Sequence, residues 1–241
     1  MKIAISDYDG TLYIDQQIQP ELLESIKAFR ERGNKFCICT GRPIESIYEQ
    51  LQLHGIPYDF IVGMNGSIGV DQDYKEAFGV YMDRSDVYTV KDILEHHGYQ
   101  NYSVSNGYVN MFIEDGNVND EEFDKLEKSG IRGFYILKNS AQEAKDMSDW
   151  INETYPEATF KAYPNRDFVS ISVKGSHKAS GVRALMNHTQ WEGDIMTFGD
   201  DFNDIPMLKA FDSYGIESGV EEAIAYAKHL VPNVNTVLDS F

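Results

Sequence analysis

Short apolar runs alternate with amphipathic stretches over the first 62 residues, and this pattern predicts strands and helices in turn. The expected strands are Lys2–Ser6, Phe36–Cys39 and Phe60–Val62. Between them, Pro20 and Pro43 each open a stretch with apolar residues at helical spacing, and Gly33 and Gly55 end these stretches. Strands that alternate with helices favour a parallel sheet with crossover helices.

The pattern changes between about residues 83 and 173, where strand-like runs follow one another more closely. Asn106-Gly107 lies between two such runs and is a strong hairpin signal. The expected elements are a helix through Val87, Val90 and Leu94, hairpin strands Tyr99–Val104 and Tyr108–Ile113, a strand Phe134–Leu137, a helix through Ala144, Met147 and Ile151, and strands Thr159–Tyr163 and Phe168–Val173. This block is typical of an α+β insert with an antiparallel sheet.

The α/β alternation resumes after the insert. The expected elements are a helix through Val182 and Leu185, a strand Ile195–Phe198, a short helix Pro206–Leu208, a strand Ser213–Ile216 and a helix Val220–Lys228. We therefore expect a core domain made of residues 1–82 and 174–241, interrupted by an α+β domain at 83–173.

Composition indicates a globular protein, because 42% of the 241 residues are hydrophobic and no apolar run approaches the length of a membrane span. No signal-peptide pattern follows Met1, so we expect a cytoplasmic protein. Cys37 and Cys39 lie two residues apart in an expected strand, where their side chains point the same way, and they are interpreted as buried fillers rather than a disulfide.

The formal net charge of −18 argues against nucleic acids and membranes as partners, because no Lys/Arg cluster compensates for it. An acidic protein that handles phosphate must still attract an anion. A divalent cation held by carboxylates would reverse the sign of the charge locally.

The most informative segment is Asp7-Tyr8-Asp9-Gly10-Thr11, which follows the apolar run Ile3-Ala4-Ile5. Gly10 permits a sharp turn, so one carboxylate can face a phosphorus atom while the other reaches the ester oxygen. A polar exit from a strand is the alternative interpretation, since acidic turn residues are common. A calcium loop that starts at Asp7 is excluded, because its sixth and twelfth positions are Leu12 and Ile18.

Three further candidate sites fall where open α/β sheets bind ligands, at strand ends or helix starts. They are Thr40-Gly41-Arg42, Lys178, and Gly199-Asp200-Asp201-Phe202-Asn203-Asp204. The last segment would lie opposite Asp7 if its strand neighbours the first strand. Taken singly, each is more often a plain turn, a solvated helix residue or a solvated acidic loop. Their joint order and placement favour a single site.

These motifs, together with Met64-Asn65-Gly66-Ser67 and Lys174-Gly175-Ser176-His177-Lys178, resemble those of the haloacid dehalogenase superfamily. More narrowly, the chain resembles the Cof-type branch with a type IIB cap, and the likeness covers essentially the whole sequence. It implies a Rossmann-like, doubly wound parallel sheet with an inserted α+β cap domain.

The resemblance also implies roles for individual residues. Asp7 would be the nucleophile, Asp9 the general acid and base, and Lys178 a catalytic cation on the phosphate. The implied phosphate-binding residues are Thr40, Gly41, Arg42, Lys178 and Asn203. Asp7, Asp9 and Asp200 would bind Mg²⁺, with Asp204 and Asp201 as supporting carboxylates. Oxygen ligands favour Mg²⁺ over zinc.

The expected function is Mg²⁺-dependent hydrolysis of a small phosphomonoester, such as a sugar phosphate, a nucleotide or a phosphorylated cofactor, through an aspartyl-phosphate. A phosphomutase and a non-catalytic phosphometabolite-binding protein are the alternatives. Tyr99, Tyr102 and Tyr108 either contact the leaving group or form the core of the insert. The loop Gly215–Gly219 departs from the Asn-Ala pattern that related chains often show, so its role is open. The oligomeric state is also left open.

Overall fold

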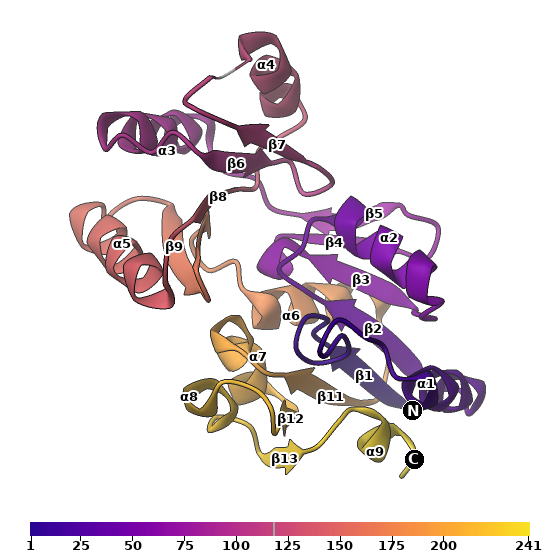
Figure 1. The fold of residues 1–241 in the computed structure, drawn as a ribbon. Helices are drawn as coiled ribbons and strands as arrows, with labels where there is room; N and C mark the ends of the chain where they lie inside the picture. The colour runs from indigo at the N-terminus through magenta and orange to yellow at the C-terminus, as the bar shows by residue number, and fades with distance from the viewer. Residues whose placement is uncertain (118) are drawn as a thin grey trace. The chain divides into compact units, whose positions relative to one another are not determined.

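The computed structural model describes residues 1–117 and 119–241, which form two compact units. The core unit comprises residues 1–79 and 177–241, and the inserted unit comprises residues 80–176. Each unit has a sheet of its own (Figure 1).

The sheet of the core unit has eight strands. In spatial order they are β13 (His229–Val231), β12 (Asp212–Ile216), β11 (Asp194–Gly199), β1 (Lys2–Ser6), β2 (Lys35–Cys39), β3 (Phe60–Gly63), β4 (Ile68–Asp71) and β5 (Glu76–Gly79). Neighbours from β13 to β3 are parallel, as predicted. The antiparallel extension by β4 and β5 was not predicted, because two four-residue strands around a tight turn leave little periodic signal.

Most helices of the core unit follow the expected alternation, but the last one, Asn235–Leu238, was not predicted. The helices are α1 (Pro20–Glu31), α2 (Ile44–His54), α6 (Lys178–Thr189), α7 (Ile205–Ala210), α8 (Glu221–Ile224) and α9 (Asn235–Leu238), with 3₁₀ turns η1 (Met64–Gly66) and η2 (Phe202–Asp204). Pro20 is the first residue of α1, where its missing N–H costs nothing. Gly55 ends α2 in the left-handed conformation, with φ 66°.

Both faces of the core sheet are covered. On one face, Ile3, Ile5, Cys37 and Cys39 pack with residues of α6 and α7, including Val182. Alternate residues of the same strands point to the other face, where α1 and α2 contact β2 and β3. This doubly wound arrangement confirms the predicted fold class. Both cysteines are buried and free, as expected.

The predicted helix Val220–Lys228 is wrong in length, because α8 ends at Ile224. The chain must turn back to pair β13 with β12, and the amide of Lys228 donates to the hydroxyl of Ser213 on β12. That tertiary pairing competes with helix propagation and ends the helix early.

The inserted unit is an α+β structure with a five-stranded antiparallel sheet. In spatial order its strands are β7 (Asn110–Ile113), β6 (Tyr102–Ser105), β8 (Gly133–Leu137), β10 (Phe168–Val173) and β9 (Phe160–Asn165), and its helices are α3 (Arg84–His96), α4 (Asp120–Lys128) and α5 (Ala141–Thr154). Helix α4 was not predicted, because only Phe123 and Leu126 interrupt its charged sequence.

The predicted hairpin is present, but its loop is longer than a two-residue turn. Ser105 pairs with Asn110, so residues 106–109 form the loop. The carboxamide oxygen of Asn106 accepts hydrogen bonds from the amides of Tyr108 and Val109. Asn106 therefore stabilises the turn through its side chain as well as through its local sequence preference.

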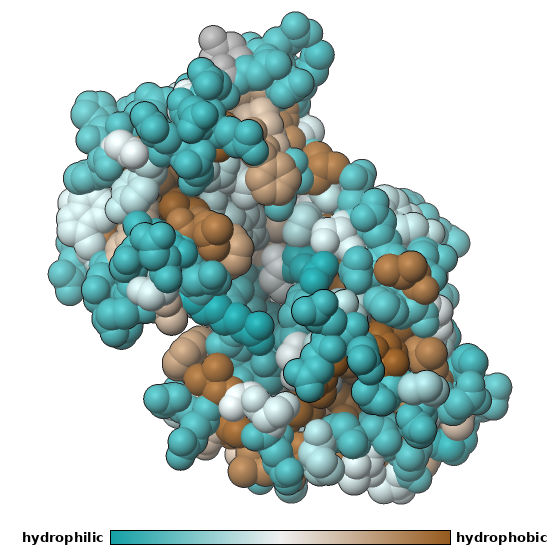
Figure 2. All heavy atoms as spheres, in the orientation of Figure 1, coloured by the Kyte–Doolittle hydropathy of each residue, from teal (hydrophilic) through white to brown (hydrophobic). Residues whose placement is uncertain are grey.

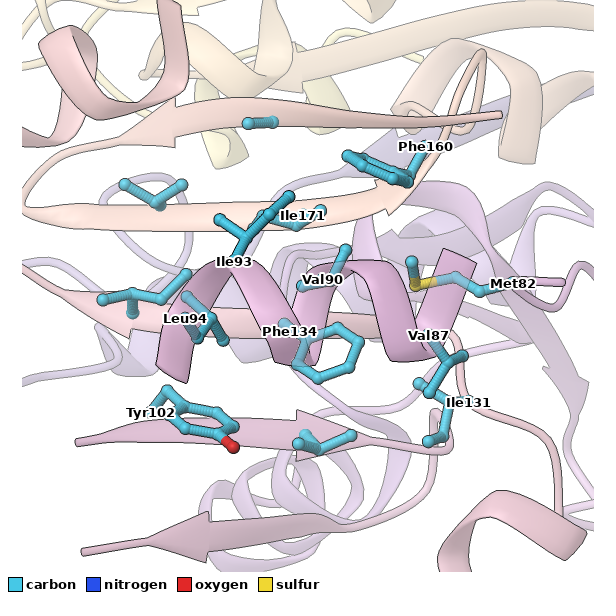
Figure 3. Close-up of a cluster of buried hydrophobic side chains, with 14 of the residues drawn as sticks. Met82, Val87, Val90, Ile93, Leu94, Tyr102, Ile131, Phe134, Phe160 and Ile171 are labelled. Atoms are coloured by element: carbon cyan, nitrogen blue, oxygen red, sulfur yellow. The ribbon is translucent and has the colours of Figure 1, made fainter. Parts of the chain in front are cut away.

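One face of the inserted sheet packs against α3, α4 and α5 around an apolar cluster, part of which is drawn in Figure 3. Val90 and Leu94 of α3 lie in this cluster with Phe134 and Ile171 of the sheet. Hydrophilic side chains cover most of the visible surface of both units (Figure 2). Among the described residues, no helix combines the length and the apolar character needed to cross a membrane.

Candidate active site

The carboxyl ends of β1 and β11 meet at one edge of the core sheet. Ser6, the last residue of β1, pairs with Phe198 of β11, and the amide of Asp7 donates to the carbonyl of Phe198 at 3.0 Å. The hypothesis that the strand before residues 199–204 neighbours the first strand is confirmed. Continued by one residue, this register brings Asp7 beside Gly199, which directly precedes Asp200.

The turn after β1 depends on Gly10. Its φ is +83°, and a Cβ atom built there would lie 2.0 Å from Oδ2 of Asp200. Thr11, the next residue, donates its hydroxyl to Oδ1 of Asp200 at 2.8 Å. The turn therefore carries no side chain at position 10 so that the Asp200 carboxylate can approach the backbone.

Lys178 is fully buried and lies between two carboxylates. Its Nζ is 2.8 Å from Oδ1 of Asp7 and 2.6 Å from Oδ1 of Asp204. As predicted, it opens a helix, and a capping box between His177 and Ser180 fixes the start of α6. The capped helix start carries Lys178 to the end of β1.

Asp204 organises the loop after β11. Its Oδ2 accepts hydrogen bonds from the amides of Asp200 and Asp201 at 3.0 and 3.1 Å, and its Oδ1 bonds to Lys178. The Asp201 side chain in turn accepts the amide of Phe202 at the start of η2. Both carboxylates therefore fix the backbone that presents Asp200.

Asp7, Asp200 and Asp204 form a buried acidic cluster, and each offers an oxygen within 4.8 Å of the others. Burial raises the pKa of Asp7 well above its ordinary value, and Lys178 only partly opposes this rise. Burial, reinforced by Asp204, raises the pKa of Asp200 to about 6. Burial lowers the pKa of Lys178, but Asp204 and Asp7 outweigh it, so the pKa rises overall.

These shifts bear on the predicted Mg²⁺ site. Burial disfavours the charged forms of Asp7 and Asp200, and a divalent cation bound beside them would favour those forms. Three carboxylates are also the hard oxygen donors that Mg²⁺ prefers. The donor set of Asp7, Asp200 and Asp204 therefore fits the ion.

Asp9 lies apart from this cluster. Arg42 donates from Nε to Oδ2 and from Nη2 to Oδ1 of Asp9, both at 2.7 Å, and its guanidinium also lies over the ring of Tyr8 at 5.3 Å. The sequence predicted Arg42 among the phosphate-binding residues and Asp9 among the metal-binding residues. In the structure the two side chains bind each other, and Asp204 is the third member of the acidic cluster.

The other predicted phosphate-binding residues follow β2 and β11. Thr40 is buried, and its hydroxyl accepts the amide of Arg42 at 3.2 Å. The carboxamide of Asn203 donates to Oδ1 of Asn65 at 3.1 Å, and both amide groups lie within 3.5 Å of where a Cβ of Gly41 would be. The sequence interpretation assigned no role to Asn65 or Thr11, although both belong to the quoted motifs.

The divergent loop Gly215–Gly219 contacts the acidic loop. A Cβ at Gly219 would lie 2.6 Å from the carbonyl oxygen of Asp200, and the amide of Val220 donates to that oxygen at 2.8 Å. The loop thus supports the backbone of Asp200 through main-chain contacts, for which the missing Asn-Ala pair is not needed.

The tyrosines of the inserted hairpin belong largely to the core of that unit. Tyr102 is 5% exposed and lies in the apolar cluster (Figure 3), and Tyr99 packs against the same cluster. For these two residues the structure favours the core role over contact with a leaving group. Tyr108 is partly exposed in the hairpin loop.

This chain is similar to known proteins in both sequence and structure. A family model of haloacid dehalogenase-like hydrolases matches residues 4–239. A Haemophilus influenzae protein provisionally named a phosphatase is 23% identical over 224 residues, which are 86% of this chain and 83% of that protein.

Two solved structures are similar over nearly the whole chain. A provisionally named HAD/COF-like hydrolase from Plasmodium vivax has a TM-score of 0.82 at 22% identity, with 98% of this chain and 94% of the other covered. A HAD subclass IIB sugar phosphatase has a TM-score of 0.74 at 21% identity, with 100% and 99% covered. At these identities the likeness shows a shared fold.

Proposed function

The chain belongs to the haloacid dehalogenase-like hydrolase family, and on that premise we propose that it is a Mg²⁺-dependent phosphatase that hydrolyses small phosphomonoesters through an aspartyl-phosphate on Asp7. The observation that carries the proposal is the fully buried Lys178, whose ammonium bridges Asp7 and Asp204 beside Asp200. A buried cation beside an acidic cluster is costly as a purely structural device. It suits a site that must bring an anionic nucleophile to an anionic substrate.

Asp7 is the proposed nucleophile. An oxygen of its carboxylate forms a bond to phosphorus while the bond from phosphorus to the ester oxygen breaks. Its raised pKa opposes ionisation, so the ammonium of Lys178 has to hold it as the carboxylate. A Mg²⁺ ion held by Asp7, Asp200 and Asp204 would supply further positive charge to offset repulsion between the nucleophile and the phosphate.

Asp9 is the proposed general acid and base. It gives a proton to the departing ester oxygen, and then accepts one from the water that attacks the aspartyl-phosphate and releases inorganic phosphate. Both of its oxygens are bound by Arg42 in the structure. Asp9 must therefore release at least one of these hydrogen bonds before it can act on the substrate.

The phosphoryl oxygens are proposed to bind the hydroxyl of Thr40, the backbone at Gly41, the ammonium of Lys178 and the carboxamide of Asn203. Thr40 and Gly41 follow β2, and Asn203 follows β11, so the residues come from loops at the same edge of the sheet. The proposed substrate class is a small soluble phosphate ester. The fold likeness to a sugar phosphatase supports a sugar phosphate within that class.

A phosphate-release screen over sugar phosphates, nucleotides and phosphorylated cofactors, with and without Mg²⁺, tests the proposal. We expect Mg²⁺-dependent release, and we expect Asp7→Asn to lower turnover by several orders of magnitude because the nucleophile is lost. Asp15→Asn is the matched control, since Asp15 is an exposed residue of the same turn segment. Full activity in Asp7→Asn, or in excess chelator, would refute the mechanism.

A further inference from the structure

The loop Met64–Ser67 after β3 has an unusual backbone for its sequence. Met64 and Asn65 have φ values of 51° and 52°, and Gly66 follows at 97°. Left-handed backbone conformations are uncommon in residues other than glycine. Two such residues directly before a left-handed glycine persist only where surrounding contacts hold them.

Main-chain hydrogen bonds supply those contacts. The amide of Met64 donates to the carbonyl of Arg42, and the amide of Asn65 donates to the carbonyl of Thr40, both at 3.0 Å. The strained loop is therefore fastened to both ends of the Thr40-Gly41-Arg42 turn. A shift of the loop would move this turn.

The same loop also packs against the start of α6. A Cβ at Gly66 would lie 2.3 Å from the carbonyl oxygen of His177, and a Cβ at Gly181 would lie 2.6 Å from the Cα of Gly66. The two backbones touch beside the residue that precedes Lys178. The loop after β3 is thus in contact with the segment that presents the catalytic cation.

The side chain of Asn65 reaches a third segment. Its Oδ1 accepts a hydrogen bond from Nδ2 of Asn203, at 3.1 Å, across 138 residues of sequence. The other polar atom of that carboxamide, Oδ1 of Asn203, is buried and has no hydrogen-bond partner among the described residues. A buried acceptor without a donor is unfavourable, and it indicates a position at which a ligand is expected.

A joint half-turn of the two carboxamides would keep the bond between them with donor and acceptor exchanged. It would place the NH₂ group of Asn203 at the position now held by its unpartnered oxygen. From that position the group can donate to a phosphate oxygen, while Oδ1 of Asn203 accepts from Asn65.

We infer that Asn65 is a positioning residue for phosphate binding: it holds the carboxamide of Asn203 and the Thr40–Arg42 turn where the phosphoryl oxygens bind. This inference rests on the proposed function, in which Thr40, Gly41 and Asn203 contact the phosphate. It extends that function to a residue that has no contact of its own with the reacting atoms.

Asn65→Gly is the decisive variant, because glycine adopts the left-handed conformation readily and only the carboxamide is lost. Gln190→Gly is the matched control, since Gln190 is an exposed carboxamide residue with φ 54° at the end of α6. Asn203→Ala breaks the same hydrogen bond from the other side. The double variant Asn65→Gly/Asn203→Ala completes a double-mutant cycle.

Binding of inorganic phosphate in the presence of Mg²⁺ is measured by isothermal titration calorimetry, beside KM and kcat for p-nitrophenyl phosphate. We expect Asn65→Gly to weaken phosphate binding about tenfold, as outer residues that orient binding groups do, and to raise KM with a smaller change in kcat. Gln190→Gly should bind as the wild type does. In the Asn203→Ala background, Asn65→Gly should change binding by less than about twofold.

Wild-type binding in Asn65→Gly would overturn the inference, and so would fully additive losses in the double variant. Failure of the wild type to bind inorganic phosphate would overturn it as well. The proposed function has a separate failure, in which phosphate binds and Asn65→Gly weakens it but no ester of the panel is hydrolysed. The two hypotheses are thus distinguishable.

Discussion

Replacement of Lys178 by methionine tests how much the buried ammonium contributes to the site. Methionine has a similar length but no charge, so it leaves Asp7 and Asp204 buried without their cation. At an effective dielectric constant of about 20, each contact of 2.8 or 2.6 Å corresponds to an attraction of about 6 kcal/mol. The cost of desolvating the ammonium offsets part of this attraction.

The expected net loss is about 3–5 kcal/mol in the free energy of unfolding, which is typical of removing one partner of a buried pair. Lys2→Met is the matched control. Lys2 pairs with Asp194 at a similar 2.9 Å, but the pair is exposed, so a far smaller loss than for Lys178→Met is expected. The contrast separates burial from contact distance.

The assay is urea unfolding in a Trp150→Phe background with excess chelator. The chain has two tryptophans, and Trp191 then reports on the core unit alone. Because the inserted unit then contributes no tryptophan fluorescence, a single transition can be assigned to the unit that holds Lys178.

The loss in the free energy of unfolding of Lys178→Met should depend on pH. Without Lys178, the pKa of Asp7 rises further above its unfolded value, so the variant loses stability as pH rises and regains it as pH falls. Asp200, whose pKa is raised to about 6, already loses its contribution in the wild type as pH rises from about 4 to about 6, and without Lys178, which lowers this pKa, the rise would be larger in the variant. The difference between wild type and variant should therefore be larger at pH 8 than at pH 5. A loss below about 1 kcal/mol, or one that does not change with pH, would refute the reasoning.

Three further predictions concern Gly10, Asp59 and Asp9. Gly10→Ala should lower kcat/KM at least about 100-fold, because the new Cβ would lie 2.0 Å from Oδ2 of Asp200 and would push that carboxylate out of place. A rate near that of the wild type would contradict the proposed role of the carboxylate. Burial raises the pKa of Asp59, but hydrogen bonds from Arg30 and other donors lower it overall, so the stability that Asp59 contributes is present above about pH 4 and lost as pH falls further. Asp59→Ala should weaken this decrease in the free energy of unfolding at acid pH, as measured by urea titrations. An unchanged decrease would mean that other groups cause it. Asp9→Asn should slow sugar-phosphate hydrolysis more than p-nitrophenyl phosphate hydrolysis, since nitrophenolate leaves without a proton, and equal slowing would remove the acid role.

The sequence alone determined the order and type of most elements of the core unit. Apolar runs bounded by Pro20, Gly33 and Gly55 carry strong local signals, and their alternation implies a parallel sheet whatever the order of its strands. The edge that carries the site follows as well, because motifs after parallel strands gather at one end. Asp7 and Asp200 could therefore be expected together on the condition that their strands are neighbours, and the pairing of β1 with β11 meets that condition.

Elements whose signal is weak locally were missed or misjudged. Strands β4 and β5 are too short for periodicity to show, and α4 has too few apolar residues. Helix α8 ends early because β13 must return to the sheet. In each case a tertiary contact, rather than the local pattern, decides the structure.

Only the tertiary structure decided which side chains pair within the site. The bond from Thr11 to Asp200 spans 189 residues, and that from Asn203 to Asn65 spans 138. Local pattern carries no information on contacts at such separations, so the sequence could place Arg42 near the site but could not pair it with Asp9. Chain composition and periodicity fix the elements and the edge at which they end, whereas strand order and packing fix the partner of each charge.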